Sequence, residues 1–118
     1  MNKRYRLQKN KDFQRVYHKA KSQALPTMAL LALKNRNDQL RFGFSVSKKV
    51  GKAVVRNRVR RRLREATRLR VPDLQRGFSV VIVVRQAAVE ATYARLQRDL
   101  DTLLTRAGLL LANRPPKG

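Results

Sequence analysis

The sequence has few of the residues from which catalytic and metal sites are usually built. Its 118 residues include no cysteine, no tryptophan, one histidine and seven acidic residues. Without cysteine, disulfides and cysteine-ligated zinc sites are excluded, and a reducing compartment is permitted. We therefore expect a cytoplasmic protein, with no signal peptide in the basic stretch at residues 1–11. The longest apolar runs, 28–33 and 80–84, are far shorter than the roughly 20 residues of a membrane-spanning helix.

The scarcity of acidic side chains also bears on catalysis. A nuclease that works with two metal ions needs carboxylates that converge on the cations, and a metal-free ribonuclease needs a pair of acid–base groups. His18 is the single histidine. The acidic residues are spread along the chain at Asp12, Asp38, Glu65, Asp73, Glu90, Asp99 and Asp101. We therefore expect no catalytic residues, no metal ligands and no cofactor bound by the protein itself.

Positive charge is what the sequence has in excess. Twenty-nine Lys and Arg face seven Asp and Glu, which gives a formal net charge of +22. A chain with that charge repels itself, and a polyanion relieves the repulsion. Nucleic acid is a better candidate for this polyanion than a membrane surface. Helices that lie on membranes usually carry tryptophan or phenylalanine on an apolar face, and this chain has no tryptophan. With 42% hydrophobic residues we expect one RNA-binding domain, with a flexible basic arm over about 1–9 and a tail over about 109–118.

The first half of the chain is expected to form a helix and two strands. The helix covers about 10–20, and the strands cover 28–34 and 40–46. The polar stretch between the two strands predicts that they form a hairpin. Along the second strand, small or basic residues alternate with apolar ones and would leave one face open to a ligand; they are Arg41, Gly43 and Ser45.

The second half alternates helix, strand and helix. The strand at 78–84 is continuously apolar, which is typical of a strand buried on both faces and often parallel to its neighbour. The helices are expected at about 53–70 and 92–106. Their buried stripes would consist of Val55, Val59, Leu63, Ala66 and Leu69 in the first, and of Tyr93, Leu96, Leu100 and Leu103 in the second.

The segment from Lys48 to Arg70 holds eleven Lys and Arg against the single acid Glu65. Like charges four residues apart destabilise a helix by about 0.2–0.5 kcal/mol per pair. A solvated helix face normally mixes the two signs, so this composition indicates binding rather than stability. Arginine is favoured over lysine here, and its planar guanidinium binds phosphate through two nitrogens and stacks on bases. The segment therefore predicts an RNA-binding surface.

The run from Phe44 to Glu65, centred on Arg56-Asn57-Arg58, resembles the signature of the bacterial ribonuclease P protein family. The similarity continues upstream over 10–17 and more loosely downstream, so that it covers roughly residues 4–106. It implies a two-layer α+β domain of αβββαβα type, with a mixed sheet and a basic crossover helix. That fold is similar to the second domain of a small-subunit ribosomal protein.

The resemblance also implies partners and site residues. In this family the arginine-rich helix and its preceding loop bind the catalytic RNA subunit, which cleaves with bound Mg²⁺, and no obligate protein partner is evident. Carried over to this chain, that site consists of Lys48, Lys49, Lys52, Arg56, Asn57, Arg58, Arg60, Arg61 and Arg64. The basic arm would add phosphate contacts through Lys3, Arg4, Arg6, Lys9 and Lys11.

A second family site is a cleft between the first helix and the sheet, which receives the single-stranded 5′ leader of precursor tRNA. Here it would consist of Phe13, Tyr17, Ser45 and Ser47. The two aromatic rings either stack on the leader or attach the helix to the sheet, and Tyr17 is expected to be partly exposed. Where family members often carry a further aromatic, this chain has Leu30-Leu31-Ala32.

Three other hypotheses are compatible with a small basic chain. A ribosomal protein would share the charge but not the ordered run at 44–65. An autonomous ribonuclease would need the acid–base groups that this sequence lacks. A DNA-binding architectural protein would prefer duplex DNA to structured RNA at the same salt concentration.

Overall fold

A computed structural model describes residues 5–7, 9–36 and 38–111. Its elements follow the order helix, three strands, helix, strand, helix, as the family resemblance implies. They are α1 (Asn10–Lys19), β1 (Lys21–Ala24), β2 (Met28–Lys34), β3 (Leu40–Ser45), α2 (Ala53–Arg70), β4 (Phe78–Val84) and α3 (Tyr93–Arg106). Short 3-10 helices cover Lys48–Val50, Val71–Asp73 and Gln86–Ala88. No helix in these ranges is both long enough and apolar enough to cross a bilayer.

The four strands form one mixed sheet in the order β1-β2-β4-β3. The predicted hairpin between β2 and β3 is wrong, because β4 lies between them. All seven residues of β2 pair antiparallel with β4, from Met28 opposite Val84 to Lys34 opposite Phe78. On its other edge β4 pairs in parallel with β3. A strand whose side chains are apolar at six of seven positions is most stable in the centre of a sheet, covered on both faces. The buried, parallel strand predicted at 78–84 is thereby confirmed.

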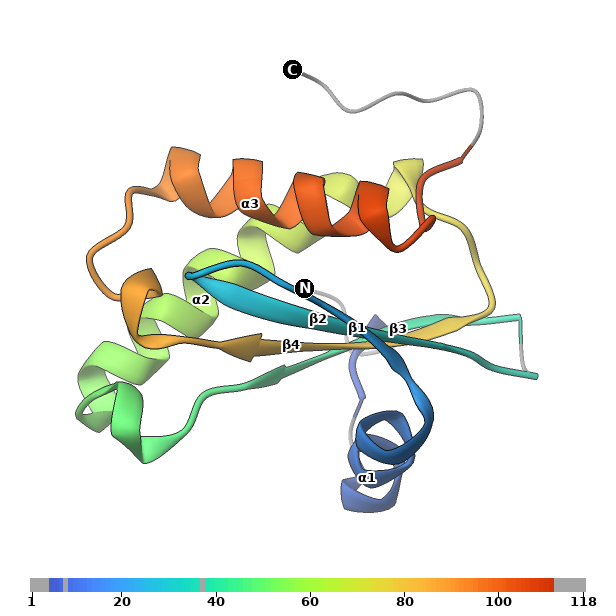
Figure 1. Ribbon diagram of the computed structural model, residues 1–118, viewed down its shortest axis with the longest axis horizontal. Coiled ribbons are helices and arrows are strands. Elements are labelled where there is room, and N and C mark those ends of the chain that lie inside the picture. The colour runs from blue at the N-terminus through green and yellow to red at the C-terminus, as the bar shows by residue number, and fades with distance from the viewer. Residues whose placement is uncertain (1–4, 8, 37, 112–118) are drawn as a thin grey trace.

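Helices cover both faces of this sheet (Figure 1). The larger core lies under α2 and α3 and includes Phe42 and Ile82 from the sheet. The buried stripe predicted for α3 is confirmed at Leu96, Leu100 and Leu103, with Tyr93 partly buried. In α2 the prediction is confirmed at Val59, Leu63 and Ala66 but wrong at Leu69, which is 48% exposed.

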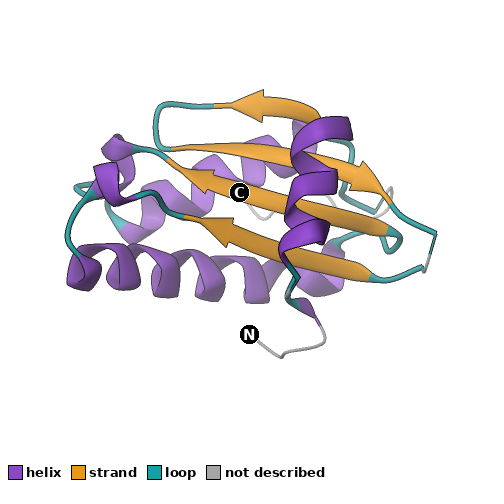
Figure 2. Ribbon diagram, turned by 90° about the horizontal axis from the view of Figure 1, so that it is seen from below, coloured by secondary structure: helices purple, strands orange, loops and turns teal. Residues whose placement is uncertain are grey.

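The opposite face of the sheet is crossed by α1 (Figure 2). Val16 of α1 packs with Leu7 and Val81 in a smaller core, with Phe13 against its edge. The sequence predicted that the face containing Gly43 is open, but a Cβ added at Gly43 would lie 2.5 Å from Cζ of Phe13. A side chain at this position would displace the Phe13 ring, so glycine permits the close approach of α1, and this part of the face is covered.

The described ends of the chain lie against the domain. Leu7 is buried and its N–H donates to the Phe42 carbonyl at 2.8 Å, so residues 5–7 follow the outer edge of β3. Leu109 is also buried, and its carbonyl accepts from the Gln75 N–H at 2.7 Å. The expected arm and tail therefore include docked residues. Lys3, Arg4 and the tail from 112 onward lie outside the described residues.

One arginine of the basic segment has a structural position. The Arg70 side chain is 8% exposed, and its Nη1 lies 3.0 Å from Oδ2 of Asp73. Its Nε lies 2.7 Å from Oδ1 of Asp101 on α3, as an ion pair without good hydrogen-bond alignment. Burial raises the pKa of Asp101, while the neighbouring Arg70 charge acts in the opposite direction. Arg70 therefore links the end of α2 to α3.

This placement predicts that Arg70→Met lowers the free energy of unfolding by about 2–3 kcal/mol, because two largely buried carboxylates lose their cation. Arg58→Met is the matched control, since Arg58 is exposed on the same helix, and should change stability by less than about 0.5 kcal/mol. Urea denaturation at constant salt measures both. Equal stabilities of the two variants would contradict the structural role of Arg70.

Candidate RNA interface

The nine residues assigned to the RNA-subunit site are brought together along α2 and the 3-10 turn before it. Six are exposed: Lys48, Lys49, Lys52, Asn57, Arg58 and Arg61. Three are half-buried and recur every four residues along the helix: Arg56, Arg60 and Arg64. The Oδ1 atom of Asn57 accepts a hydrogen bond from Nη1 of Arg60 at 2.9 Å, so the amide holds a neighbouring guanidinium in position.

Most cations of this surface have no anionic partner among the described residues. Within the described ranges no carboxylate lies within 4.0 Å of the guanidinium groups of Arg56, Arg58, Arg60, Arg61, Arg62 and Arg64. Arg68 differs, because it donates to Glu65 through two nitrogens at 3.0 and 2.5 Å. These hydrogen bonds lower the pKa of Glu65. Arg68, which was not assigned to the RNA-subunit site, is therefore paired within the protein.

Arg64 lies close to two other arginines, Arg6 and Arg60. Burial first, and then the charges of Arg6 and Arg60, lower the pKa of Arg64 below its usual value. The Nε atoms of Arg56 and Arg64 are buried without a hydrogen-bond partner among the described residues. An external phosphate would neutralise this cluster and accept from its outward nitrogens.

Sequence reasoning missed the position of Arg6. It was expected in a flexible arm, but a parallel β-bridge between Arg6 and Phe42 holds it beside β3, where its charge acts on Arg64. The only signal in the sequence was its charge, because a single backbone bridge has no recognisable pattern. Arg6 therefore extends the basic surface of α2 around the edge of the sheet.

The acidic side chains are largely engaged with basic or polar residues. Asp99 accepts from Thr27 Oγ1 at 2.7 Å and lies 3.6 Å from Nε of Arg95, whereas Asp101 contacts Arg70. These two carboxylates of α3 thus contact different parts of the protein. In the ranges that the structure covers, no three Asp, Glu or His side chains come together as metal ligands do. The carboxylate donors that Mg²⁺ prefers are thus not gathered into one site here.

The four residues assigned to the leader site lie along one flank of α1 and the adjoining end of β3. Tyr17 is 38% exposed, which confirms its predicted partial exposure. Phe13 instead packs over Gly43, which favours the role of attaching α1 to the sheet. Ser45 is half-buried on the same side of β3 as Gly43, and Ser47 is exposed just beyond the strand. Under α1 the sheet presents the aliphatic residues Leu31, Leu33, Val81 and Val83.

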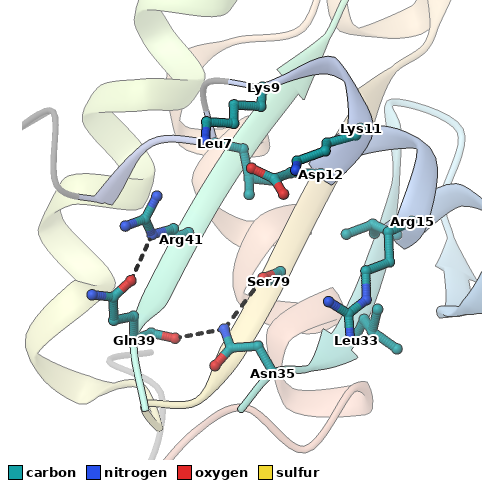
Figure 3. A pocket seen from close by; sticks show the side chains of 11 residues that line it. Leu7, Lys9, Lys11, Asp12, Arg15, Leu33, Asn35, Gln39, Arg41 and Ser79 are labelled. Carbon is teal, nitrogen blue, oxygen red and sulfur yellow. Dashed lines mark hydrogen bonds between the residues drawn. The ribbon is translucent and has the colours of Figure 1, made fainter. Parts of the chain in front are cut away.

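The other flank of α1 holds a hollow of about 300 Å³ that sequence reasoning missed (Figure 3). We call it the α1 pocket. Cationic residues from α1 and β3 line it, among them Arg15 and Arg41, together with Asn35 and Gln39 from the connection after β2. These residues come from separate elements, so no local motif indicates the pocket.

Comparison with known proteins places this arrangement in a family. A model of the ribonuclease P family matches residues 1–108. The ribonuclease P protein component of Symbiobacterium thermophilum is 42% identical over 111 residues, which cover 93% of this chain and 96% of the relative. That of Alkaliphilus oremlandii is 40% identical over 105 residues, 89% of this chain and 92% of the relative.

Solved structures agree with the sequence comparison. The ribonuclease P protein of Staphylococcus aureus superposes with a TM-score of 0.84 at 34% identity, covering 91% of this chain and 98% of that one. The Thermotoga maritima protein superposes with a TM-score of 0.78 at 30% identity, covering 86% and 96%. The element order, the arginine-rich helix and the sequence identity agree, and this chain belongs to the ribonuclease P protein family.

Proposed function

We propose that this protein, as the protein component of a tRNA-processing endoribonuclease complex, binds the catalytic RNA subunit through α2 and the 5′ leader of precursor tRNA through the Tyr17 flank of α1. In this role it aids the Mg²⁺-dependent removal of the leader and contributes no catalytic residue. We also propose that it works in the cytoplasm without an obligate protein partner.

The observation that carries the proposal is the set of unpaired arginines on α2. A protein that uses six to ten cations against phosphates gains an affinity that falls steeply with salt, because each contact releases bound counterions. Here six arginines of one helix lack a carboxylate partner among the described residues. Four of them are half-buried against the helix, Arg56, Arg60, Arg62 and Arg64, and these lose less side-chain freedom on binding than a fully exposed arginine would.

The proposed division of labour follows from the carboxylates. Because no group of acidic side chains in the described ranges is arranged as a metal site, the catalytic Mg²⁺ ions would be held by the RNA. The positive charge of α2 would reduce repulsion between phosphates, so the complex would need less Mg²⁺ than the RNA alone.

The leader site rests on Tyr17 more than on Phe13. Base stacking on an exposed aromatic ring is tolerant of sequence and is worth about 1–3 kcal/mol per base. Tyr17 is partly exposed, whereas Phe13 packs over Gly43. The aliphatic sheet surface beneath α1 offers no further ring, so the leader would be bound more by Tyr17 and nearby cations than by a stack of aromatics.

For the α2 surface we expect Arg58→Gln to weaken binding of the RNA subunit about tenfold and to raise the Mg²⁺ needed for cleavage, because one charge-assisted phosphate contact is lost. Filter binding over a range of salt concentrations measures the affinity, and circular dichroism checks the helix. Arg98→Gln on α3 removes the same charge from another exposed position and should change affinity less than about twofold. Normal RNA binding by Arg58→Gln with reduced helicity would mean that the motif is structural.

For the leader site we expect Tyr17→Ala to weaken binding of precursor tRNA by the holoenzyme about five- to thirtyfold, with no change for mature tRNA. Phe13→Ala should instead lower the free energy of unfolding by about 2–3 kcal/mol, because it leaves a cavity over Gly43. Competition binding with the two tRNAs and thermal unfolding separate the two effects. Equal weakening for precursor and mature tRNA would rule out leader contact by Tyr17.

A further inference from the structure

The α1 pocket is strongly basic. Four cationic side chains line it, Lys9, Lys11, Arg15 and Arg41, against the single carboxylate of Asp12. Figure 3 shows Arg15 and Arg41 on opposite sides, with Lys9 and Lys11 at the rim beside Asp12. None of the four cations forms an ion pair within the described part of the chain. A net charge of this size in a concave site attracts an anion.

The polar groups of the pocket are held in place before any ligand arrives. Nδ2 of Asn35 donates to the Gln39 carbonyl at 2.9 Å and to Oγ of Ser79 at 3.2 Å. Nε of Arg41 donates to Oε1 of Gln39 at 2.9 Å, and the two Nη groups of Arg41 have no partner among the described residues. A positioned guanidinium can bind phosphate through two nitrogens at a small cost in side-chain entropy.

The pocket also has an apolar part, formed by Leu7, Val16 and Leu33. At about 300 Å³ it is at the lower end of the volumes of ligand pockets. Cations at the rim, fixed amide and hydroxyl groups, and an apolar base together suit one nucleotide: its phosphate at the guanidinium groups, its ribose or base edge at the amides, and its ring over the aliphatic side chains.

The pocket is separated from the Tyr17 flank of α1. Phe13 and Leu7 both lie over Gly43, since a Cβ added there would be 2.5 Å from Cζ of Phe13 and 3.2 Å from Cδ1 of Leu7. No strand of RNA can pass under the helix at this point. A leader bound beside Tyr17 therefore does not reach the α1 pocket by a path beneath the helix.

The pocket is instead continuous with the basic surface of α2. Residues 5–7 run along β3, the lowest strand in Figure 2, and connect the two sites. Arg6 is close enough to Arg64 of α2 to lower its pKa, and it pairs with Phe42, the residue after Arg41 on β3. Cations thus extend from α2 around the edge of the sheet to Arg41 without crossing the Tyr17 flank.

We infer that the α1 pocket binds one nucleotide of a single-stranded segment of the same catalytic RNA that α2 contacts, with its phosphate at Arg15 and Arg41. This second RNA site rests on the proposed function of α2. It would fix the orientation of the protein on the RNA, because two separated contacts define a direction that a single basic helix does not.

The test measures binding of the RNA subunit alone by Arg15→Gln, Arg41→Gln and the double variant over a range of salt concentrations. Each single variant should bind about tenfold more weakly, and the slope of log affinity against log salt should fall by about 1. Arg98→Gln is the control for loss of one charge, and thermal unfolding checks the fold. Because the chain has no cysteine, Gln14→Cys, at an exposed position of α1 next to Arg15 that does not line the pocket, can carry an iron chelate, and hydroxyl radicals from it should cut one region of the RNA subunit.

Unchanged affinity and salt slope in the double variant would overturn the inference. So would a loss seen only with precursor tRNA that carries a leader, since the leader would then be the occupant. Arg58→Gln, measured in parallel, separates this failure from failure of the proposed function. If Arg58→Gln weakens binding and the pocket variants do not, only the α1 pocket is refuted, and if Arg58→Gln also binds normally, the role of α2 is refuted.

Discussion

Burial of β4 on both faces and along both edges is the constraint on which the rest of the structure depends. Six of its seven residues are apolar, so β2 and β3 flank it and helices cover it above and below. The parallel pairing of β3 with β4 requires a crossover connection, and that connection is α2. The arginine-rich helix is therefore held by its own buried stripe against the core, with its opposite face outside.

The distribution of charge follows from the same arrangement. Acidic side chains are placed where they stabilise the protein: Asp101 and Asp73 hold Arg70, and Asp99 binds Thr27. Six arginines of α2, between Arg56 and Arg64, have no such partner among the described residues, and Arg64 is placed near two further arginines. Self-repulsion of this kind destabilises the free protein and is relieved by a polyanion. Different arginines of one basic segment thus serve stability and RNA binding: Arg70 is buried in ion pairs, whereas Arg58 is exposed to a ligand.

Elements with a strong local pattern could be predicted from the sequence. The apolar run of β4 predicts a buried strand, and the leucine stripe of α3 predicts a helix packed on the core. The charge of α2 predicts an RNA-binding surface. The hairpin between β2 and β3 was wrong because adjacency in sequence does not show that a later strand will insert between them. Leu69 was wrong because the buried side of α2 continues through Thr67 and Arg70, and Leu69 lies to one side of it. Gly43, Arg6 and the α1 pocket depend on contacts between distant residues, which no local pattern contains.

The central claim is that this protein binds RNA and leaves cleavage to it. The most direct measurement is cleavage of precursor tRNA by the protein alone, by the catalytic RNA alone, and by both together, at increasing Mg²⁺. The account predicts no 5′ maturation with the protein alone at any Mg²⁺ concentration. It also predicts that adding the protein lowers the Mg²⁺ concentration at which the RNA cleaves. Accurate 5′ maturation by the protein without the RNA subunit would contradict it.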